Sequence, residues 1–274
     1  MRLWDLRTAK ELRPLPNLAR SYCVAFSPDG SKVLSGGDIK ALRLYDVASG
    51  KELRRFDGHE HAPMRVAFSA DGRQVLSGDW GGGLRLWDVE SGKELQNLQG
   101  HTSLIHSVAF AADGKTAASG GADKTIRFWD LKTGEEIRRI DANAEGVTGV
   151  AFAPDGKQLL SSHTDGTLRW WSVATGKEVR RFNVQTDTIQ SMALSPDGRF
   201  ALTGGGADIS NGWKTGTDFS VRLWDVALGK EVQRFEGHQD IVDWVPLSRD
   251  GRYALSGSHD GSMRLWCLPK AAAK

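Results

Sequence analysis

The sequence predicts an all-β protein that folds as a propeller of four-stranded antiparallel blades. The 274-residue chain has 32 glycines and 10 tryptophans, a composition typical of many tight turns between short strands. A turn motif ending in Asp-Gly follows six short apolar segments. An aromatic residue also returns at intervals of about 42 residues, the length of one propeller blade. Its positions are Trp4, Tyr45, Trp87, Trp129, Trp171, Trp224 and Trp266.

The first strand of each repeat is short and apolar, and we expect it to be the inner, buried strand. Its copies are Cys23–Ser27, Arg65–Ser69, Ser107–Ala111, Gly149–Ala153, Ser191–Ser195 and Trp244–Ser248. In the turn that follows, Asp caps the turn and Gly takes the positive φ. The second strand is of the type of Val33–Ser35, and the third carries the aromatic residue, as in Leu84–Trp87.

The fourth strand follows a Ser-Gly-Lys or Thr-Gly-Lys turn and is rich in charge, as in Glu52–Phe56. We expect this strand at the outer edge of the blade, because long cations discourage pairing with other chains. Acidic neighbours balance its arginines. Edge protection therefore explains these arginines better than a nucleic-acid contact does.

The number of blades is open from the sequence, which predicts six full blades plus a partial one. Six-fold closure would use Glu11–Leu15 as the outer strand of the blade built from Ile241–Leu268, with Met1–Leu6 displaced. Alternatively, the chain is an incomplete seven-blade ring. The apolar faces of its two terminal blades would then be exposed to water, at a free-energy cost of about 25 cal/mol per Å². Either way we predict a single domain over residues 1–268 and a tail over residues 269–274.

Bulk composition limits the partners and the compartment. The formal net charge is +2, which gives no reason to expect a nucleic-acid or membrane partner. There is no apolar run of membrane-spanning length and no signal peptide. Cys23 and Cys267 are the only cysteines, so no disulfide framework is implied. We expect a cytoplasmic protein.

Over nearly its whole length the sequence resembles the WD40-repeat family. Gly-His pairs precede three repeats, and in two of these repeats a Ser, an Asp and a Trp follow the His at the same distances. In two repeats all four residues are present: His101, Ser119, Asp123 and Trp129, and His238, Ser256, Asp260 and Trp266. The resemblance implies that each set forms a buried hydrogen-bonded chain, so these histidines are structural. The style of the repeats is similar to that of bacterial arrays that often accompany Ser/Thr kinase domains, although no kinase signature is present.

Other repeats depart from this pattern and are expected to be less stable, because they lack part of the hydrogen-bonded chain. His59, Ser77 and Trp87 keep register, but Gly81 stands at the Asp position. Asn143 stands at the His position of the fourth repeat. Asn17 and Gln185 occupy that position in the first and fifth repeats. These blades should depend more on apolar packing.

No motif in the sequence supports catalysis. There is no phosphate-binding loop, no Cys-x-x-Cys pair and no Gly-x-Ser-x-Gly elbow, so we predict neither a cofactor nor a metal. A calcium site from Asp208, Asn211 and Asp218 lacks a recognisable spacing. A propeller enzyme is the remaining catalytic alternative, with a site at the channel mouth around His106, Asp243 and His259.

The resemblance places binding residues on one rim, the top face, which carries the loops between second and third strands and those leading into inner strands. An 11-residue excess in the fifth repeat, within Gly204–Thr217, lengthens one of these loops. Exposed Trp, Tyr and Arg are typical of binding hot spots. The candidates are Arg20, Tyr22, Trp80, Leu104, His106, Gln190, Trp213, Asp243 and His259.

The leading functional hypothesis is therefore a non-enzymatic scaffold that binds a protein or peptide on its top face. A second hypothesis is a ligand-sensing regulatory module of a larger signalling protein. Trp213 either contacts a partner or folds over the central opening, and the sequence favours neither.

Overall fold

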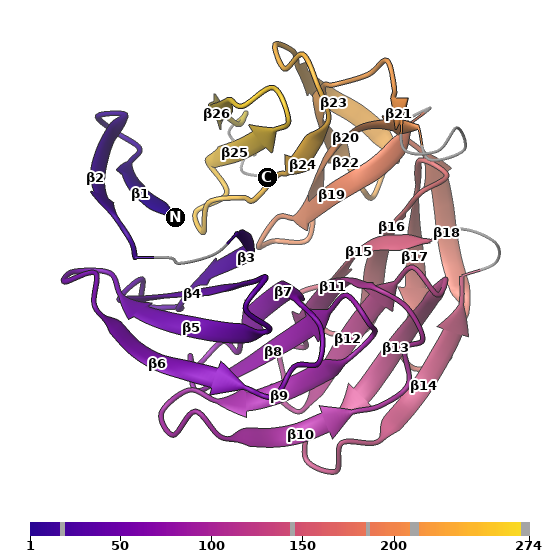
Figure 1. Ribbon diagram of the computed structural model, residues 1–274. Helices are drawn as coiled ribbons and strands as arrows, with labels where there is room; N and C mark the ends of the chain where they lie inside the picture. Colours follow the sequence, from indigo (N-terminus) through magenta and orange to yellow (C-terminus); the bar gives the residue numbers. More distant parts are fainter. Residues whose placement is uncertain (17–19, 143–145, 185–186, 209–213, 270–274) are drawn as a thin grey trace. The chain divides into compact units, whose positions relative to one another are not determined.

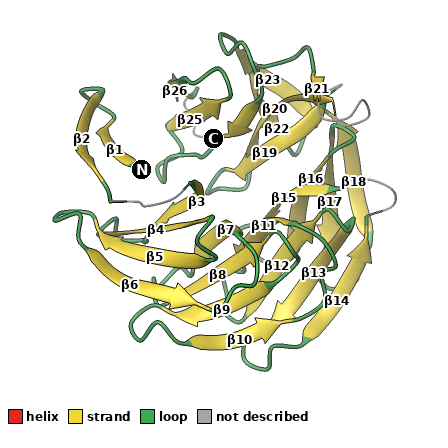
Figure 2. Ribbon diagram, viewed as in Figure 1, coloured by secondary structure: helices red, strands yellow, loops and turns green. Residues whose placement is uncertain are grey.

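The computed structural model describes residues 1–16, 20–142, 146–184, 187–208 and 214–269. Within these ranges every regular element is a β-strand, which confirms the all-β class (Figure 2). No helix there has the length and apolar character needed to cross a bilayer. The chain forms two compact units, residues 1–141 and 142–274.

The first unit contains a hairpin and three four-stranded sheets, all built from strands that are consecutive in sequence (Figure 1). The hairpin is β1 (Arg2–Asp5) and β2 (Lys10–Pro14). The sheet of the first repeat is β3 (Ser21–Phe26), β4 (Lys32–Gly37), β5 (Ala41–Asp46) and β6 (Glu52–Asp57). That of the second is β7 (Pro63–Phe68), β8 (Gln74–Asp79), β9 (Leu84–Asp88) and β10 (Glu94–Leu98). That of the third is β11 (Ile105–Phe110), β12 (Thr116–Gly121), β13 (Thr125–Asp130) and β14 (Glu136–Asp141).

The second unit continues the same antiparallel pattern through three more repeats. The sheet of the fourth repeat is β15 (Val147–Phe152), β16 (Gln158–His163), β17 (Thr167–Ser172) and β18 (Glu178–Asn183). The fifth repeat has β19 (Thr188–Leu194), β20 (Phe200–Asp208), β22 (Val221–Asp225) and β23 (Lys230–Phe235), with β21 (Lys214–Thr215) added to β20. The sixth has three strands, β24 (Val242–Trp244), β25 (Tyr253–Ser258) and β26 (Met263–Cys267).

The apolar core of each unit lies between consecutive sheets. Between the first and second repeats, Leu44 and Phe56 pack against Val75 and Trp87, and all four side chains are buried. The Phe56 and Trp87 rings meet edge to face, with centroids 5.9 Å apart. Burying each such side chain contributes about 2 kcal/mol, so packing between these two sheets stabilises both of them.

The hairpin β1–β2 differs from the pairing expected for six-fold closure. Glu11 of β2 lies opposite Trp4 of β1, in the register that the third and fourth strands of other repeats adopt. Leu15 follows β2 and packs on Val33 and Tyr45 of the first repeat. Six-fold closure would require β2 to pair with the third strand of the last blade. Instead β2 pairs with β1, because Met1–Leu6 has a third-strand sequence and is adjacent in the chain.

Three outer strands contact the repeat that follows them through polar side chains. Arg54 on β6 donates to the Ser91 carbonyl, in the turn between the third and fourth strands of the next repeat. Gln96 on β10 donates to Lys132 O in the third repeat, and Arg180 on β18 donates to Leu228 O in the fifth. These side chains fasten β6, β10 and β18 to the repeat that follows each of them, a contact that the sequence pattern did not indicate.

Candidate protein-binding face and its supporting hydrogen bonds

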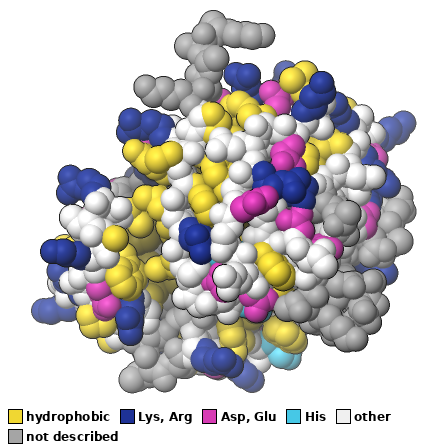
Figure 3. All heavy atoms as spheres, turned by 90° about the horizontal axis from the view of Figure 1, so that it is seen from above, with side chains coloured by type: hydrophobic (Ala, Val, Ile, Leu, Met, Phe, Trp, Pro, Cys, Tyr) yellow, Lys and Arg dark blue, Asp and Glu magenta, His cyan; other side chains and the backbone are white. Residues whose placement is uncertain are grey.

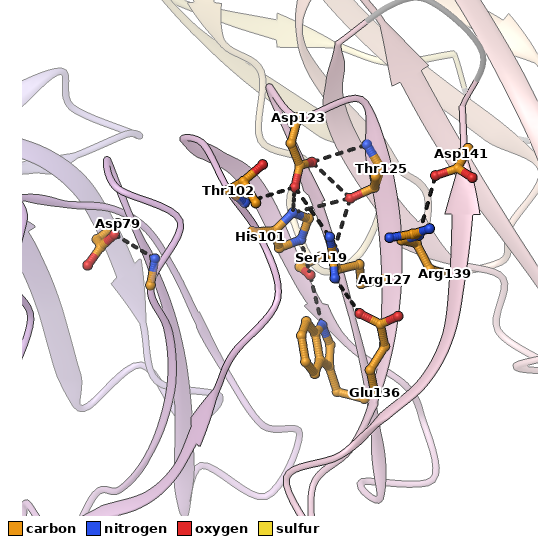
Figure 4. A network of polar contacts seen from close by, with 12 residues as sticks. Asp79, His101, Thr102, Ser119, Asp123, Thr125, Arg127, Glu136, Arg139 and Asp141 are labelled. Carbon is orange, nitrogen blue, oxygen red and sulfur yellow. Dashed lines mark hydrogen bonds and ion pairs between the residues drawn. The ribbon is translucent and has the colours of Figure 1, made fainter.

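The third repeat contains a buried polar chain of four side chains (Figure 4). The Trp129 indole N–H donates to Ser119 Oγ at 2.8 Å, and Ser119 Oγ lies 2.7 Å from His101 Nε2. His101 Nδ1 is 2.8 Å from Asp123 Oδ2. Because the Asp123 carboxylate can only accept, His101 Nδ1 carries a proton and donates to it. The chain links the inner loop, the second strand and the third strand.

Asp123 anchors this chain and also shapes the loop above it. Burial alone would raise its pKa, but hydrogen bonds from His101, Thr125 and the Thr102 amide outweigh burial and hold the pKa well below its usual range. The carboxylate therefore stays ionised and fixes the turn between β12 and β13. Arg127 adds an ion pair at 3.7 Å (Figure 4). The sixth repeat has the same chain through His238, Ser256, Asp260 and Trp266.

The second repeat corrects the expectation that a Gly at the Asp position weakens the chain. Asp79, two residues before Gly81, supplies the carboxylate, with Oδ2 2.9 Å from His59 Nδ1. His59 Nε2 is 2.6 Å from Ser77 Oγ, which accepts from Trp87. Asp79 is only 2 % exposed and also accepts from the Gly81 and Gly83 amides. The chain is complete in this repeat, with its acid on the second strand instead of the turn.

Gly83 is the residue that makes this substitution possible. A Cβ at Gly83 would lie 2.6 Å from Asp79 Oδ2, so the carboxylate occupies the space of a side chain. At the matching position of the third repeat, Thr125 fills that space and donates to Asp123. Gly83 thus has a structural cause, since the turn must leave room for an acid that comes from the strand.

The fourth repeat is corrected in a similar way. His163, two residues after Ser161 on β16, takes part in place of a loop histidine, with Nε2 2.7 Å from Ser161 Oγ. The Trp171 indole donates to the same hydroxyl at 2.7 Å. Asp165 in the turn is bound by Arg169 and Thr167. Asn143 lies outside the described residues. The fifth repeat retains only the bond from Trp224 to Thr203, at 3.0 Å, among its described residues.

The network of the second repeat fixes the turn that carries Trp80. Trp80 directly follows Asp79, donates its amide to Ala62 O and leaves 59 % of its surface exposed. Tyr22 is exposed on β3, and a hydrogen bond to Asp38 is the main cause of its raised pKa. Arg20 is also exposed and adjoins this pair. The first unit therefore presents an exposed Trp, Tyr and Arg on loops and strand ends of its first two repeats.

His106 and Leu104 occupy less accessible positions at the start of the third repeat. Both are half-buried. Burial, together with the nearby Arg65 charge, lowers the pKa of His106 to about 4, so its imidazole is neutral at pH 7. The Leu104 carbonyl accepts from Ala122 and ties the loop to the turn. A neutral, enclosed imidazole suits recognition through hydrogen bonds better than binding through positive charge.

In the second unit the structure joins two of the candidates. His259 Nε2 lies 2.5 Å from Asp243 Oδ2, and both side chains are about half exposed. Gln190 is half-buried on β19. Of the three residues in the catalytic alternative, only Asp243 and His259 share a unit and touch. No cluster of three or more His, Cys, Asp or Glu side chains in the described ranges has a metal-binding arrangement.

The insertion of the fifth repeat is a β-hairpin extension. Ala207 and Asp208 at the end of β20 pair with Thr215 and Lys214 of β21. Asp187, at the start of the repeat, accepts from the Thr217 and Asp218 amides and fixes the base of the extension. The sequence analysis did not identify this aspartate, because its proximity to the insertion arises only in the folded chain. Trp213 lies outside the described residues.

Charges on the surface are mixed. On one face, Lys and Arg side chains are interspersed with Asp and Glu (Figure 3). Ion pairs such as Arg181–Glu178 and Arg234–Glu231 show the same balance on the outer strands. The formal net charge of +2 is thus distributed without a strongly basic block among the described residues of that face.

Comparison with known proteins identifies the repeat. The model of the family described as "WD domain, G-beta repeat" matches residues 19–46, 50–88, 92–130, 134–172, 176–225 and 229–267. Similar curated proteins include small ribosomal subunit protein RACK1z of Arabidopsis thaliana, 48 % identical over 54 residues, which are 18 % of this chain and 16 % of that protein. Protein ROOT INITIATION DEFECTIVE 3 of the same plant is 41 % identical over 49 residues, 18 % of this chain and 11 % of that protein.

A human relative is WD repeat-containing protein 36, 39 % identical over 51 residues, which are 19 % of this chain and 6 % of that protein. Each of these three matches spans less than a fifth of the relative's length. These relatives are eukaryotic, and the bacterial, kinase-associated style does not follow from them.

Proposed function

Because the chain belongs to the WD40 family of β-propellers, we propose that it is a non-enzymatic scaffold that binds a protein or peptide through its top face. The observation that carries this proposal is Trp80. A large apolar side chain with 59 % exposure is costly to leave in water, yet its turn is fixed by the buried Asp79–His59 pair. A rigid, exposed aromatic residue is the usual anchor of a protein-binding hot spot.

The neighbouring side chains extend the anchor into a surface. Tyr22 and Arg20 add a second aromatic ring and a guanidinium group on the first repeat of the same unit, and Asp38 holds the Tyr22 hydroxyl. Tyr and Arg are the residues that, with Trp, are enriched in interface hot spots. The partner is a protein or peptide, with no role proposed for nucleic acid or membrane. RACK1z is named as a small ribosomal subunit protein, so a ribosome-associated partner belongs among the candidates tested.

The test compares Trp80→Ala with a matched apolar truncation away from the top face. Ile137 on the outer strand β14 is 54 % exposed and lies in the same unit, so Ile137→Ala is the control. Proteins captured by the wild-type chain should be lost with Trp80→Ala, with a weakening of at least about tenfold, and retained with Ile137→Ala. Identical capture by all three proteins, each with an unchanged thermal melt, would refute the top-face proposal.

A ligand-sensing module within a longer signalling protein is the second proposal, and the Asp243–His259 pair supports it. This half-exposed pair could accept a small polar ligand. A metabolite panel should then raise the melting temperature of the wild-type chain but not that of His259→Gln. If no metabolite in the panel shifts the melting temperature, the ligand-sensing proposal is refuted and only the scaffold proposal remains.

A further inference from the structure

The second unit has an apolar cleft between the fifth and sixth repeats, distinct from the loops that carry Trp80. Its volume is about 360 Å³. Phe200 and Leu223 line it from the fifth repeat, and Leu247 and Leu268 line it from the sixth. Arg249 and Arg252 lie at its rim. The space suits one bulky side chain of a partner, at the small end of the range for ligand pockets.

Two departures from the pattern of the first four repeats occur at this cleft. The inner strands of the first four repeats end in Ala-Phe, and Phe68 and Phe110 fill the cores between their sheets. The sixth repeat has Pro246 and Leu247 at these positions. Proline cannot donate to the strand ladder, and β24 spans only Val242–Trp244. Leucine is smaller than phenylalanine, so the end of the inner strand fills less of the space.

Three further departures occur around the same opening. Phe200 and Tyr253 begin the second strands of their repeats, where the first four repeats have Lys, Gln or Thr. Arg249 stands in the turn where the other five repeats have Pro or Ala. Apolar and basic residues therefore replace the usual ones at one place, which is the composition of a recognition site and not of a solvated turn.

The charges at the rim indicate what the cleft would accept. Asp250 is used within its own turn, by Ser248 Oγ, the Arg252 amide and the Arg252 guanidinium at 2.6 Å. Asp197 is likewise used by Ser195 Oγ and the Arg199 amide. Arg249 is exposed and forms no ion pair with any residue in the described ranges. Among the described charged residues of the rim, Arg249 is the one whose side chain forms no hydrogen bond or ion pair, so it can pair with a carboxylate of a partner.

We propose that this cleft binds an extended peptide segment of a partner protein in which a Phe or Leu side chain lies next to an acidic residue. The apolar side chain enters between Leu247 and Phe200, and the carboxylate meets Arg249. The chain's own last five residues are two Lys and three Ala, which offer neither a bulky apolar side chain nor an acid. The site is separate from the top face and does not depend on the scaffold proposal.

Fluorescence anisotropy with a synthetic peptide tests this proposal on the full chain. The probe is a fluorescein-labelled heptapeptide with a central Phe flanked by Asp, and its controls have Gly for Phe or Lys for Asp. The Asp-flanked Phe peptide should bind at least about tenfold more tightly than either control. Equal affinity for all three peptides would overturn the proposal.

Two variants locate the site. Leu247→Phe introduces the side chain of the first four repeats, fills the cleft and should weaken binding at least about tenfold. Arg249→Glu leaves the core untouched and should transfer the preference to the Lys-flanked peptide. Arg73→Glu, in the matching turn region of the second repeat, and Trp80→Ala should bind as the wild type does. Unchanged affinity in Leu247→Phe and Arg249→Glu would refute the site, as would loss of binding in Trp80→Ala. A wild-type dimer that Leu247→Phe dissociates would show that a second copy occupies the cleft instead.

Discussion

The second and third repeats build the same buried polar chain with the acid in different places. In the third repeat Asp123 reaches His101 from the turn, and Thr125 fills the space beside it. In the second repeat Asp79 reaches His59 from the end of the strand, and Gly83 leaves the space that its carboxylate takes. The comparison teaches that the buried imidazole requires a carboxylate partner, while the sequence position that supplies this carboxylate can differ between repeats.

The fourth repeat extends the comparison to the imidazole itself. His163 occupies the position on its second strand that Asp79 occupies on β8, two residues after the central serine. This one position therefore supplies the acid in the second repeat, where Asp79 bonds the His59 ring, and the imidazole in the fourth, where His163 bonds the Ser161 hydroxyl. A buried indole N–H and hydroxyl must find partners, and leaving one without a partner costs about 1–3 kcal/mol.

The largest expected effect comes from breaking the chain in the second repeat. Asp79→Ala removes the partner of His59 and of two turn amides inside the core. We expect a loss of about 3 kcal/mol in the free energy of unfolding, since an ionic partner is removed from a buried site. Urea unfolding measures the loss. Asp71→Ala, in the exposed turn of the same repeat, is the control, and an equal loss in both variants would contradict a complete chain here.

The next effect tests whether His163 substitutes for a loop histidine. His163→Ala removes the ring that bonds Ser161 and leaves a cavity, so we expect a loss of about 2 kcal/mol. Native-state hydrogen exchange should show faster exchange of amides in β16 and β17. His61→Ala, in an exposed loop, should change stability by less than about 0.5 kcal/mol. Protection of β16 equal to that of the wild type would show that His163 does not stabilise this repeat.

A smaller effect is expected from filling the space beside Asp79, and a second variant should restore the lost stability. Gly83→Ala places a Cβ 2.6 Å from the Asp79 carboxylate and should cost about 1–2 kcal/mol. Combining Asp79→Gly, Gly81→Asp and Gly83→Thr recreates the pattern of Gly121, Asp123 and Thr125 in the third repeat. This triple variant should regain most of the stability lost by Asp79→Ala in urea unfolding. A triple variant as unstable as Asp79→Ala would show that the two arrangements are not equivalent.

The smallest expected effect is a dependence of stability on pH. It should come from His106 of the third repeat, whose matching residue in the fourth repeat is Thr148, which does not titrate. Burial lowers the pKa of His106 to about 4, whereas an unfolded histidine titrates near 6.5. Between these values the unfolded chain binds the extra proton, so stability should fall by about 1 kcal/mol or more as pH drops from 6.5 to 4. His106→Thr, which carries the residue of the fourth repeat at position 148, should flatten the melting temperature over this range. The same slope in both proteins would exclude His106 as its source.

The candidate site was only partly predictable from the sequence. Repeat register placed Trp80 in a loop between the second and third strands, and its side chain is exposed there. It did not identify Asp79 or His163 as members of the polar chains, since their roles depend on which way a side chain points at the end of a strand. Asp187 and the cleft at Leu247 were missed for the same reason, as each depends on segments far apart in the chain.

The sequence by itself determined the period, the four-stranded sheets and the alternation of buried and exposed strands, because turn chemistry and apolar spacing are local properties. Tertiary structure decided which side chains complete each buried network, how outer strands fasten to the following repeat, and that β2 pairs with β1. These outcomes depend on the space left by neighbouring residues, and that space exists only after the sheets have packed.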